Sequence, residues 1–329
     1  MTILIVKLGM LGDIVMASTM LAPLRARYAE AHISWLCYEW AAELVEQFAG
    51  IDEVIPIRGD MLFGGGQDRL LAESDAQRAL AGRHFDLVYI TYANDRYLAL
   101  VKTAECGRVV RYRGAIGPLS ERYEGVEYAR FALENESAVL EPPQFARLRA
   151  TINAVRGDMV LLAPMIGAYN RSRLRCWELK NYRTLAEKLL IKGVPVGLLG
   201  SVSETSAESA FSGLAVQSYI GKTSLRGLLE LLASARALVC GDTGTMHMSF
   251  LVDTPTVALF GPTSAVRRVP PARLKCAISV GATEGLYCTP CNSDSIAGGY
   301  PNCPSNECMK RISVERVMER LNTEQHYFV

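Results

Sequence analysis

The chain has no excess of charge of one sign. Its 329 residues include 35 lysines and arginines against 34 aspartates and glutamates, so it lacks the basic surplus typical of nucleic-acid-binding proteins. Long apolar runs are also missing, because no uncharged stretch reaches the roughly 18 residues of a membrane-spanning helix. Lys7 and Asp13 interrupt the apolar N-terminal segment, which argues against a signal peptide. We therefore expect a cytoplasmic protein that binds no nucleic acid.

Two phosphate-binding fingerprints are absent as well. The first glycine turn reads GMLG at 9–12 and lacks the central glycine of G-x-G-x-x-G, which disfavours a dehydrogenase. The P-loop pattern G-x-x-x-x-G-K-[ST] does not occur either, which disfavours phosphoryl transfer through that loop. A nucleotide ligand would have to be held in another way.

What is present is the composition of an ordinary globular protein. Half of the residues are apolar and 21% are charged, and the length suggests two domains, each large enough for its own core. Apolar segments alternate with amphipathic ones along both halves, as in parallel-sheet proteins. The predicted strands are 3–7, 32–37, 53–57, 86–91 and 108–112, then 159–164, 194–200, 216–219, 237–240, 256–260 and 274–279. The predicted helices are 13–28, 39–48, 68–81, 94–104, 142–155, 181–192, 204–211, 225–235 and 313–321.

This alternation predicts an α/β protein with two Rossmann-like domains, each a doubly wound parallel sheet, that face each other across a cleft. We place an N-terminal, acceptor-side domain at 1–155 and a C-terminal, nucleotide-sugar-binding domain at 156–329. The second domain includes a cysteine-rich loop at 288–308 and a terminal helix. Ligands in such sheets bind outside the carboxyl ends of the strands, where both glycine turns, at 9–13 and 241–244, are expected.

The second turn, GDTGTMH at 241–247, carries the strongest chemical signal. A buried strand is predicted to end there and a helix to begin, so free backbone N–H groups and the positive end of the helix dipole would face an anion. A plain capped turn is the alternative for so short a motif. If the turn binds the diphosphate of a nucleotide sugar, its residues are Asp242, Thr243, Gly244, Thr245 and His247.

Two segments together resemble a known family. LGMLGDIVMASTMLAPLRARY and GDTGTMHMSFLVDTPTVALFGPT, with WELKNYRTLAEKL and the end from CTPC to NECMKRISVERV, are similar to glycosyltransferase family 9, the ADP-heptose heptosyltransferases of lipopolysaccharide core assembly. The resemblance covers essentially the whole chain in order. It implies a GT-B fold and an inverting transfer that needs no metal or other cofactor.

The same resemblance implies the substrates. The donor would be an ADP-activated sugar, L-glycero-D-manno-heptose, and the acceptor a hydroxyl of a lipopolysaccharide-core-type glycan or another lipid-linked sugar. We expect the enzyme at the inner face of the cytoplasmic membrane, with peripheral contact. Irregular segments at 58–67 and 113–123 are expected on the acceptor side. A different nucleotide sugar, a protein acceptor, a nucleotide-sugar epimerase and a non-catalytic binding relative stay open as alternatives.

The resemblance also implies residue roles. Asp13 matches the aspartate that acts as general base, and its alternative is an N-cap that satisfies helix amides. Arg175 occupies the position of the family's lysine, two residues before Trp177, as the cation for the leaving diphosphate. Its alternative is a solvated surface charge, and the neighbouring Arg171 or Arg173 could serve instead. Glu204 matches a carboxylate for the ribose hydroxyls, with a residue at a helix start as the equal alternative. Two departures are the threonines at 19 and 245, where the family usually has proline.

Four cysteines form a separate cluster. Cys288, Cys291, Cys303 and Cys308 are spaced C-x2-C-x11-C-x4-C, which suits tetrahedral thiolate ligation of zinc or iron. Such a metal would be structural, because the glycines and prolines between the pairs form a loop that the ion would have to order. Reduced thiols are the alternative, since a cytoplasmic compartment disfavours disulfides.

Overall fold

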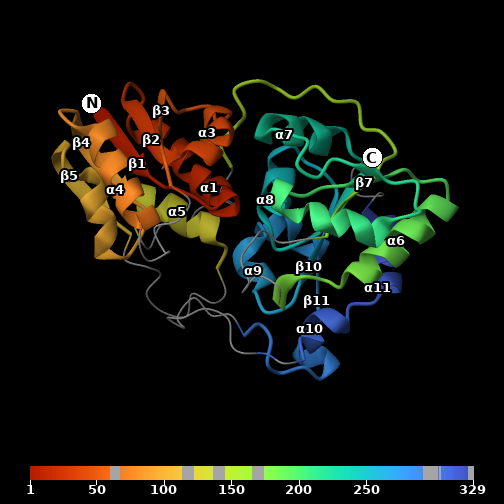
Figure 1. The fold of residues 1–329 in the computed structure, drawn as a ribbon. Coiled ribbons are helices and arrows are strands. Elements are labelled where there is room, and N and C mark those ends of the chain that lie inside the picture. The colour runs from red at the N-terminus through yellow and green to blue at the C-terminus, as the bar shows by residue number, and fades with distance from the viewer. Residues whose placement is uncertain are drawn as a thin grey trace. The chain divides into compact units, whose positions relative to one another are not determined.

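The computed structural model describes residues 1–59, 67–112, 122–135, 145–164, 174–291, 303 and 305–324. The chain divides into two compact units, Met1–Thr151 and Ile152–Val329. Each unit contains its own sheet, and every strand pairing in both sheets is parallel (Figure 1). The expectation of two Rossmann-like parallel-sheet domains is confirmed.

The first unit is a five-stranded sheet in the order β3-β2-β1-β4-β5. Its strands are β1 (Thr2–Val6), β2 (His32–Tyr38), β3 (Glu53–Ile57), β4 (His84–Ile90) and β5 (Glu105–Arg111). Its helices are α1 (Leu11–Ala17), η1 (Ser18–Met20), α2 (Leu21–Arg27), α3 (Glu39–Glu46), α4 (Gln67–Leu80), η2 (Asp95–Val101) and α5 (Glu124–Leu133). The central strand β1 is completely buried from Ile3 to Val6, as its unbroken ILIV run requires in a sheet covered on both faces.

Strand order reverses next to β1. The chain passes from β1 outward to β2 and β3, then returns to β4 on the other side of β1 and continues to β5. Ligands bind at such reversal points, beyond the carboxyl ends of the two central strands. The turn after β1 and the start of α1 lie at this point of the first sheet.

The second unit is a six-stranded sheet in the order β11-β10-β9-β6-β7-β8, which reverses in the same way between β6 and β9. Its strands are β6 (Val160–Ala163), β7 (Val196–Leu198), β8 (Gln217–Ser218), β9 (Ala237–Gly241), β10 (Thr256–Phe260) and β11 (Ala277–Ser279). Its helices are α6 (Leu179–Ile191), η5 (Val202–Phe211), α7 (Leu225–Ser234), α8 (Gly244–Leu251), α9 (Ala265–Arg268), η6 (Pro271–Cys276), η7 (Ala282–Glu284), α10 (Glu307–Lys310) and α11 (Val314–Glu324).

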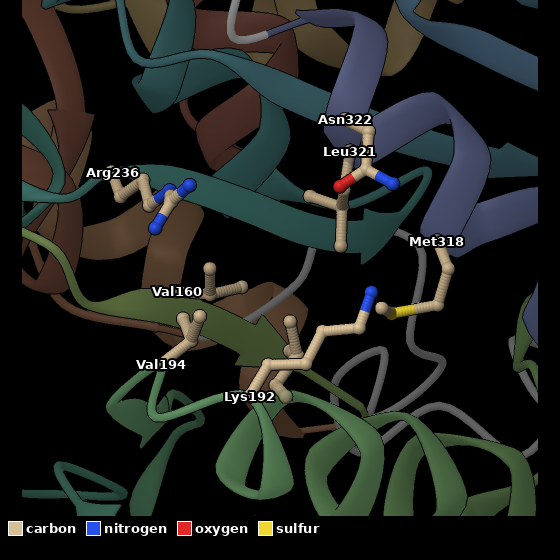
Figure 2. Close-up of a pocket in the computed structure, with 8 residues that line it drawn as sticks. Val160, Lys192, Val194, Arg236, Met318, Leu321 and Asn322 are labelled. Carbon is tan, nitrogen blue, oxygen red and sulfur yellow. The ribbon is translucent and has the colours of Figure 1, made fainter.

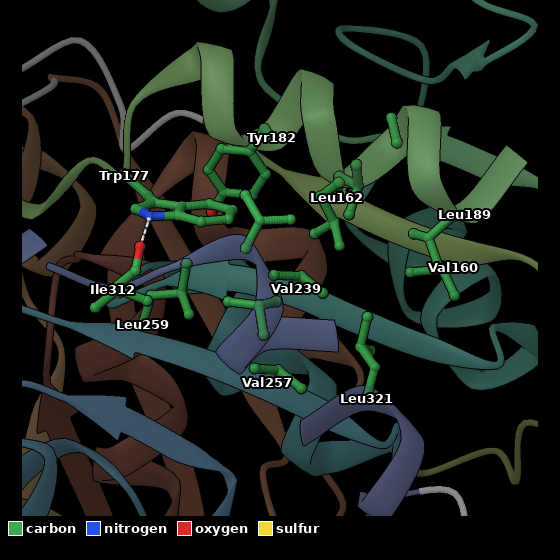
Figure 3. Close-up of a cluster of buried hydrophobic side chains, with 14 of the residues drawn as sticks. Val160, Leu162, Trp177, Tyr182, Leu189, Val239, Val257, Leu259, Ile312 and Leu321 are labelled. Atoms are coloured by element: carbon green, nitrogen blue, oxygen red, sulfur yellow. Dashed lines mark hydrogen bonds between the residues drawn. The ribbon is translucent and has the colours of Figure 1, made fainter. Parts of the chain in front are cut away.

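One face of the second sheet packs against α6 and α11 (Figure 3). Alternate residues of the central strands, such as Leu162, Val239 and Leu259, meet the apolar side of these helices, as the two-residue period of a strand dictates. Trp177, just before α6, is buried among them and donates a hydrogen bond from Nε1 to the carbonyl oxygen of Ile312 at 2.8 Å. This bond fixes the segment that carries Arg175.

The structure departs from the predicted elements at several places. The helix expected at 13–28 begins earlier, at Leu11, and consists of α1, η1 and α2. The described part of the helix expected at 142–155 is extended instead, because residues 147–149 form backbone hydrogen bonds with 47–49 beside the bridge between Phe48 and Leu148. Helix α5 was not predicted at all, although it packs on η1 and α2.

Within the described residues, no helix combines the length and the apolar character needed to cross a membrane.

Candidate functional site

Asp13 lies in the first turn of α1, at the carboxyl end of β1. Helix α1 begins at Leu11 with Met10 as its N-cap, so Asp13 is the third helical residue. The interpretation of Asp13 as an N-cap is therefore wrong. Its side chain is 34% exposed, and Oδ2 lies 3.6 Å from the Nζ of the buried Lys7. The partly exposed carboxylate of Asp13 lies where the strand order reverses and can contact a ligand there. The buried ammonium of Lys7 is its neighbouring cation.

The second glycine turn has the geometry of an anion site. Strand β9 ends at Gly241, and Thr243 is the N-cap of α8, where its Oγ1 accepts a hydrogen bond from the N–H of Met246 at 3.3 Å. Gly244 and Thr245 form the first turn of the helix, whose N–H groups have no intrahelical acceptors. An anion placed at this end would meet those donors and the positive end of the helix dipole.

Asp242 is the buried centre of this turn. Arg175 Nη1 donates to its carbonyl oxygen at 2.8 Å and to its carboxylate Oδ2 at 3.3 Å. His247 Nε2 lies 3.8 Å from the other carboxylate oxygen. Burial alone would raise the pKa of the Asp242 carboxyl, but His247, Arg268 and Arg175 hold it well below its usual range. The carboxylate is therefore charged at neutral pH, and it holds the side chains of Arg175 and His247 in place.

Buried polar atoms near this sheet edge include Nδ1 of His247 and Oγ1 of Thr263, which have no hydrogen-bond partner within the described part of the chain. His247 is only 2% exposed. Buried polar atoms are normally paired, so each such atom calls for a partner from a ligand or water. His247 lies in α8 after β9, and Thr263 follows β10, whose Leu259 pairs with Gly241 of β9, so both residues come after strands that end at the same edge.

Sequence reasoning missed Thr263 and Arg268. The signal was available, because FGPT comes directly after the predicted strand 256–260, where ligand-binding residues are expected. Arg268 ends the short helix α9 and contributes its charge to the environment of Asp242.

The side chain of Glu204 caps the start of η5. It is buried, and its Oε2 accepts hydrogen bonds from the backbone N–H of Ser201 at 2.6 Å and from the Ser201 hydroxyl at 3.0 Å. These bonds form a capping box at the start of η5. The contacts favour the helix-start interpretation, and ribose binding by Glu204 stays a prediction.

The four cysteines of the cluster are free thiols that differ in environment. Cys288 is exposed, Cys308 is buried, and the other two are half-buried. Burial raises the pKa of the Cys308 thiol to about 11. Backbone N–H groups of residues 305 and 306 lower the pKa of Cys303. Among the described residues, no three potential ligands are placed to hold a metal ion.

A separate pocket of about 240 Å³ lies at the amino ends of the strands of the second sheet, opposite to the strand ends that carry the turn at 241–247 (Figure 2). Val160 begins β6 there, Lys192 directly follows α6, and Met318 belongs to α11. This pocket is bounded by the amino ends of the strands, so it is remote from the turn at 241–247. It supplies control positions for experiments on that turn.

Some predicted residues lie outside the described part of the chain. They are 60–66 and 113–121, which make up most of the segments expected on the acceptor side, and the arginines at 171 and 173 beside Arg175.

The sequence matches a known family and its relatives. The model for "Glycosyltransferase family 9 (heptosyltransferase)" matches residues 132–295. Lipopolysaccharide heptosyltransferase 2 of Escherichia coli K12 is 23% identical over 353 residues, which covers 98% of each chain.

Solved structures of similar fold come from the same group. Escherichia coli ADP-heptose lipopolysaccharide heptosyltransferase II superposes with a TM-score of 0.76 at 20% identity and covers 99% of both chains. The iron-containing dodecameric glycosyltransferase TibC of enterotoxigenic Escherichia coli has a TM-score of 0.61 at 13% identity, with 100% of this chain and 77% of TibC covered. The predicted GT-B fold class is confirmed.

Proposed function

We propose that this chain, which belongs to glycosyltransferase family 9, transfers L-glycero-D-manno-heptose from an ADP-activated donor to a hydroxyl of a lipopolysaccharide-core-type glycan. The full-length similarity to lipopolysaccharide heptosyltransferases supports the donor and acceptor classes. The main support for this function is the turn at 241–247. It can bind an anion, and it contains the buried Nδ1 of His247, which lacks a hydrogen-bond partner in the described part of the chain. A glycosyltransferase needs such a site for its leaving diphosphate, and an epimerase is no longer required to explain it.

The turn would hold the diphosphate without a metal. N–H groups of Thr243, Gly244 and Thr245 would donate to phosphate oxygens, and His247 would donate through Nδ1 while Asp242 faces its other nitrogen. Arg175 adds a positive charge and is held in place by Asp242. Preorganised donors of this kind stabilise charge as it develops on a leaving group.

Asp13 would act as the general base of an inverting displacement. Its carboxylate takes the proton of the acceptor hydroxyl while that oxygen attacks the anomeric carbon of the heptose. The bond from the anomeric carbon to the diphosphate breaks, and ADP leaves with the electron pair. The proposal assigns the acceptor to the first unit, with the segments 58–67 and 113–123, at the cytoplasmic face of the inner membrane.

Binding of nucleotide sugars to the free protein tests the donor. We expect ADP-heptose to bind at least about tenfold more tightly than UDP-glucose or GDP-mannose, measured by titration calorimetry, because the base and the sugar both contribute contacts. A His247→Ala variant should weaken ADP-heptose about tenfold, since it removes one charge-assisted hydrogen bond. Lys192→Ala, in the pocket at the amino ends of the strands, is the matched control and should bind normally. Tighter binding of a UDP- or GDP-sugar would replace ADP-heptose as the donor.

We also propose a structural zinc or iron ion at Cys288, Cys291, Cys303 and Cys308. The donor set fits, because four free thiols suit both metals and Cys303 Sγ accepts a hydrogen bond from the N–H of residue 306 at 3.4 Å, as metal-bound thiolates commonly do. TibC, a glycosyltransferase of similar fold that contains iron, lends support. Metal binding would require the thiols to move closer together than they are here.

Metal analysis of protein purified without oxygen tests this ion. We expect about one zinc or iron per chain. Cys291→Ser should lower the affinity by more than about 100-fold, because it removes one of four ligands, whereas loss of a residue that only supports a ligand costs about 10- to 100-fold. Cys106→Ser, in the first unit, is the matched control and should keep the metal. Wild-type protein that contains no metal, and takes none up from added zinc or ferrous iron, would contradict the proposal.

A further inference from the structure

Lys7 is a buried cation that the reaction scheme has not used. It follows the last residue of β1 and is only 2% exposed. Burial of an ammonium group is strongly unfavourable unless the charge is paired and hydrogen-bonded. A lysine at this position therefore needs partners that offset its desolvation.

Tyrosines and one carboxylate supply those partners. Lys7 Nζ donates a hydrogen bond to Tyr128 Oη at 2.8 Å and lies 4.6 Å from the ring centre of Tyr92, within range of a cation–π contact. Asp13 Oδ2 is 3.6 Å away. Burial would lower the pKa of Lys7, but Tyr128 and Asp13 outweigh it and raise that pKa well above its ordinary value.

Tyr92, Tyr128 and Asp13 form a cage around the ammonium of Lys7, and further contacts connect this cage to the first sheet. Tyr92 Oη accepts a hydrogen bond from the N–H of Leu8 at 2.9 Å and donates to the carbonyl oxygen of Gly9 at 3.2 Å. The Tyr92 ring stacks on Tyr97 with centres 3.8 Å apart. The Lys7 carbonyl accepts a bond from Trp35 Nε1 at 3.0 Å. Neither the ammonium nor the turn that leads to Asp13 can move without breaking these bonds.

We propose that Lys7 is a positioning residue for Asp13: its ammonium holds the carboxylate of α1 in the place where the acceptor hydroxyl arrives. The inference rests on the proposed role of Asp13 as general base. Lys7 itself touches no substrate, because it is enclosed beneath the carboxylate. The ion pair engages Oδ2, and a third of the Asp13 side chain stays exposed for the acceptor.

Other ionisable groups near the pair are few in the described part of the first unit. Tyr92 and Tyr97 face Lys7 from the end of β4 and from η2, and Tyr128 faces it from α5. Burial raises the pKa of all three, so they are neutral at pH 7. Glu124 of α5 acts on Tyr128, and Tyr38 of β2 acts on Tyr97. None of these groups carries a positive charge, so Lys7 is the cation among them.

Lys7→Met tests the role, because methionine keeps an unbranched apolar chain in the cage and removes only the charge. With ADP-heptose and a lipopolysaccharide core that lacks its last heptose, kcat should fall about 10- to 100-fold while KM for the donor stays within about twofold. Tyr128→Phe, which keeps both charges, should lower kcat less than Lys7→Met does. Lys102→Met, a change at an exposed lysine of the same unit, should leave both quantities unchanged.

A double-variant cycle separates the possible failures. Lys7→Met should slow Asp13→Asn by less than about twofold, as expected when both residues act through one interaction. A wild-type kcat in Lys7→Met together with an inactive Asp13→Asn overturns the role of Lys7 alone. Equal rate losses in both backgrounds mean a structural role and overturn it as well. Normal turnover by Asp13→Asn overturns the proposed general base and this inference together.

Discussion

Replacement of Asp13 by asparagine should lower the rate of heptose transfer by about 10²–10⁴-fold and leave ADP-heptose affinity within about twofold. The size follows from the usual contribution of a positioned general base. Affinity should survive because the anion-binding turn at 241–247 belongs to another sheet. Initial rates and titration calorimetry on the same preparation measure the two effects, and a loss confined to kcat would identify an interaction made in the transition state.

The matched control for this variant is Glu30→Gln, an exposed carboxylate of the same unit, which should transfer at the wild-type rate. Thermal unfolding of Asp13→Asn must show a folded protein, because the substitution also removes the partner of Lys7. Near-normal turnover by a folded Asp13→Asn would mean that another group, or water, takes the proton.

Replacement of Asp242 by asparagine should destabilise the second unit by about 3 kcal/mol at pH 7, because it removes the carboxylate that the guanidinium of Arg175 and the ring of His247 face inside the protein. The native pKa of Asp242 lies below its unfolded value, so its stabilisation is fully present above the ordinary pKa of about 4 and is lost as the pH falls below it. The difference in unfolding free energy from wild type should be flat between pH 8 and 5 and shrink below about 4. Urea unfolding across this range measures it.

A double variant controls for effects outside the pair. Arg175→Met alone should also destabilise the protein, and Asp242→Asn should be much less damaging in the Arg175→Met background, because the two groups share one interaction. Additive losses, or a difference that grows toward acid pH, would contradict the view of Asp242 as the charged brace of this turn.

The sequence was sufficient for the elements with strong local signals. Unbroken apolar runs such as ILIV identified buried parallel strands, and GDTG identified a strand end followed by a helix start, which the structure has at β9 and α8. Helix boundaries were less certain. The first helix was predicted to begin at Asp13, because aspartate is a common N-cap, whereas it begins two residues earlier, at Leu11, with Met10 before it. Helix α5 was missed, because no element was predicted between residues 112 and 142.

The sequence could not reveal which side chains pair with the buried charges of Lys7 and Asp242. Tyr128 is 121 residues from Lys7, and Arg175 is 67 residues from Asp242. Arg175 reaches Asp242 because parallel strands bring their carboxyl ends to one edge of the second sheet, and Tyr128 reaches Lys7 because α5 packs on α1, η1 and α2. Glu204 is different, because Ser201 and Glu204 have the S-x-x-E spacing of a capping box. That local pattern was visible, and it explains the contacts of Glu204 without a ligand.

The most direct test of the account is the release of ADP from ADP-heptose with and without a lipopolysaccharide core acceptor. Wild-type protein should release ADP in step with heptose appearing on the acceptor, and release should be slow when the acceptor is left out. The folded Asp13→Asn variant should bind the donor and release ADP at no more than about a hundredth of the wild-type rate. ADP release that does not depend on acceptor, or that survives in Asp13→Asn, would contradict a transfer reaction with Asp13 as its base.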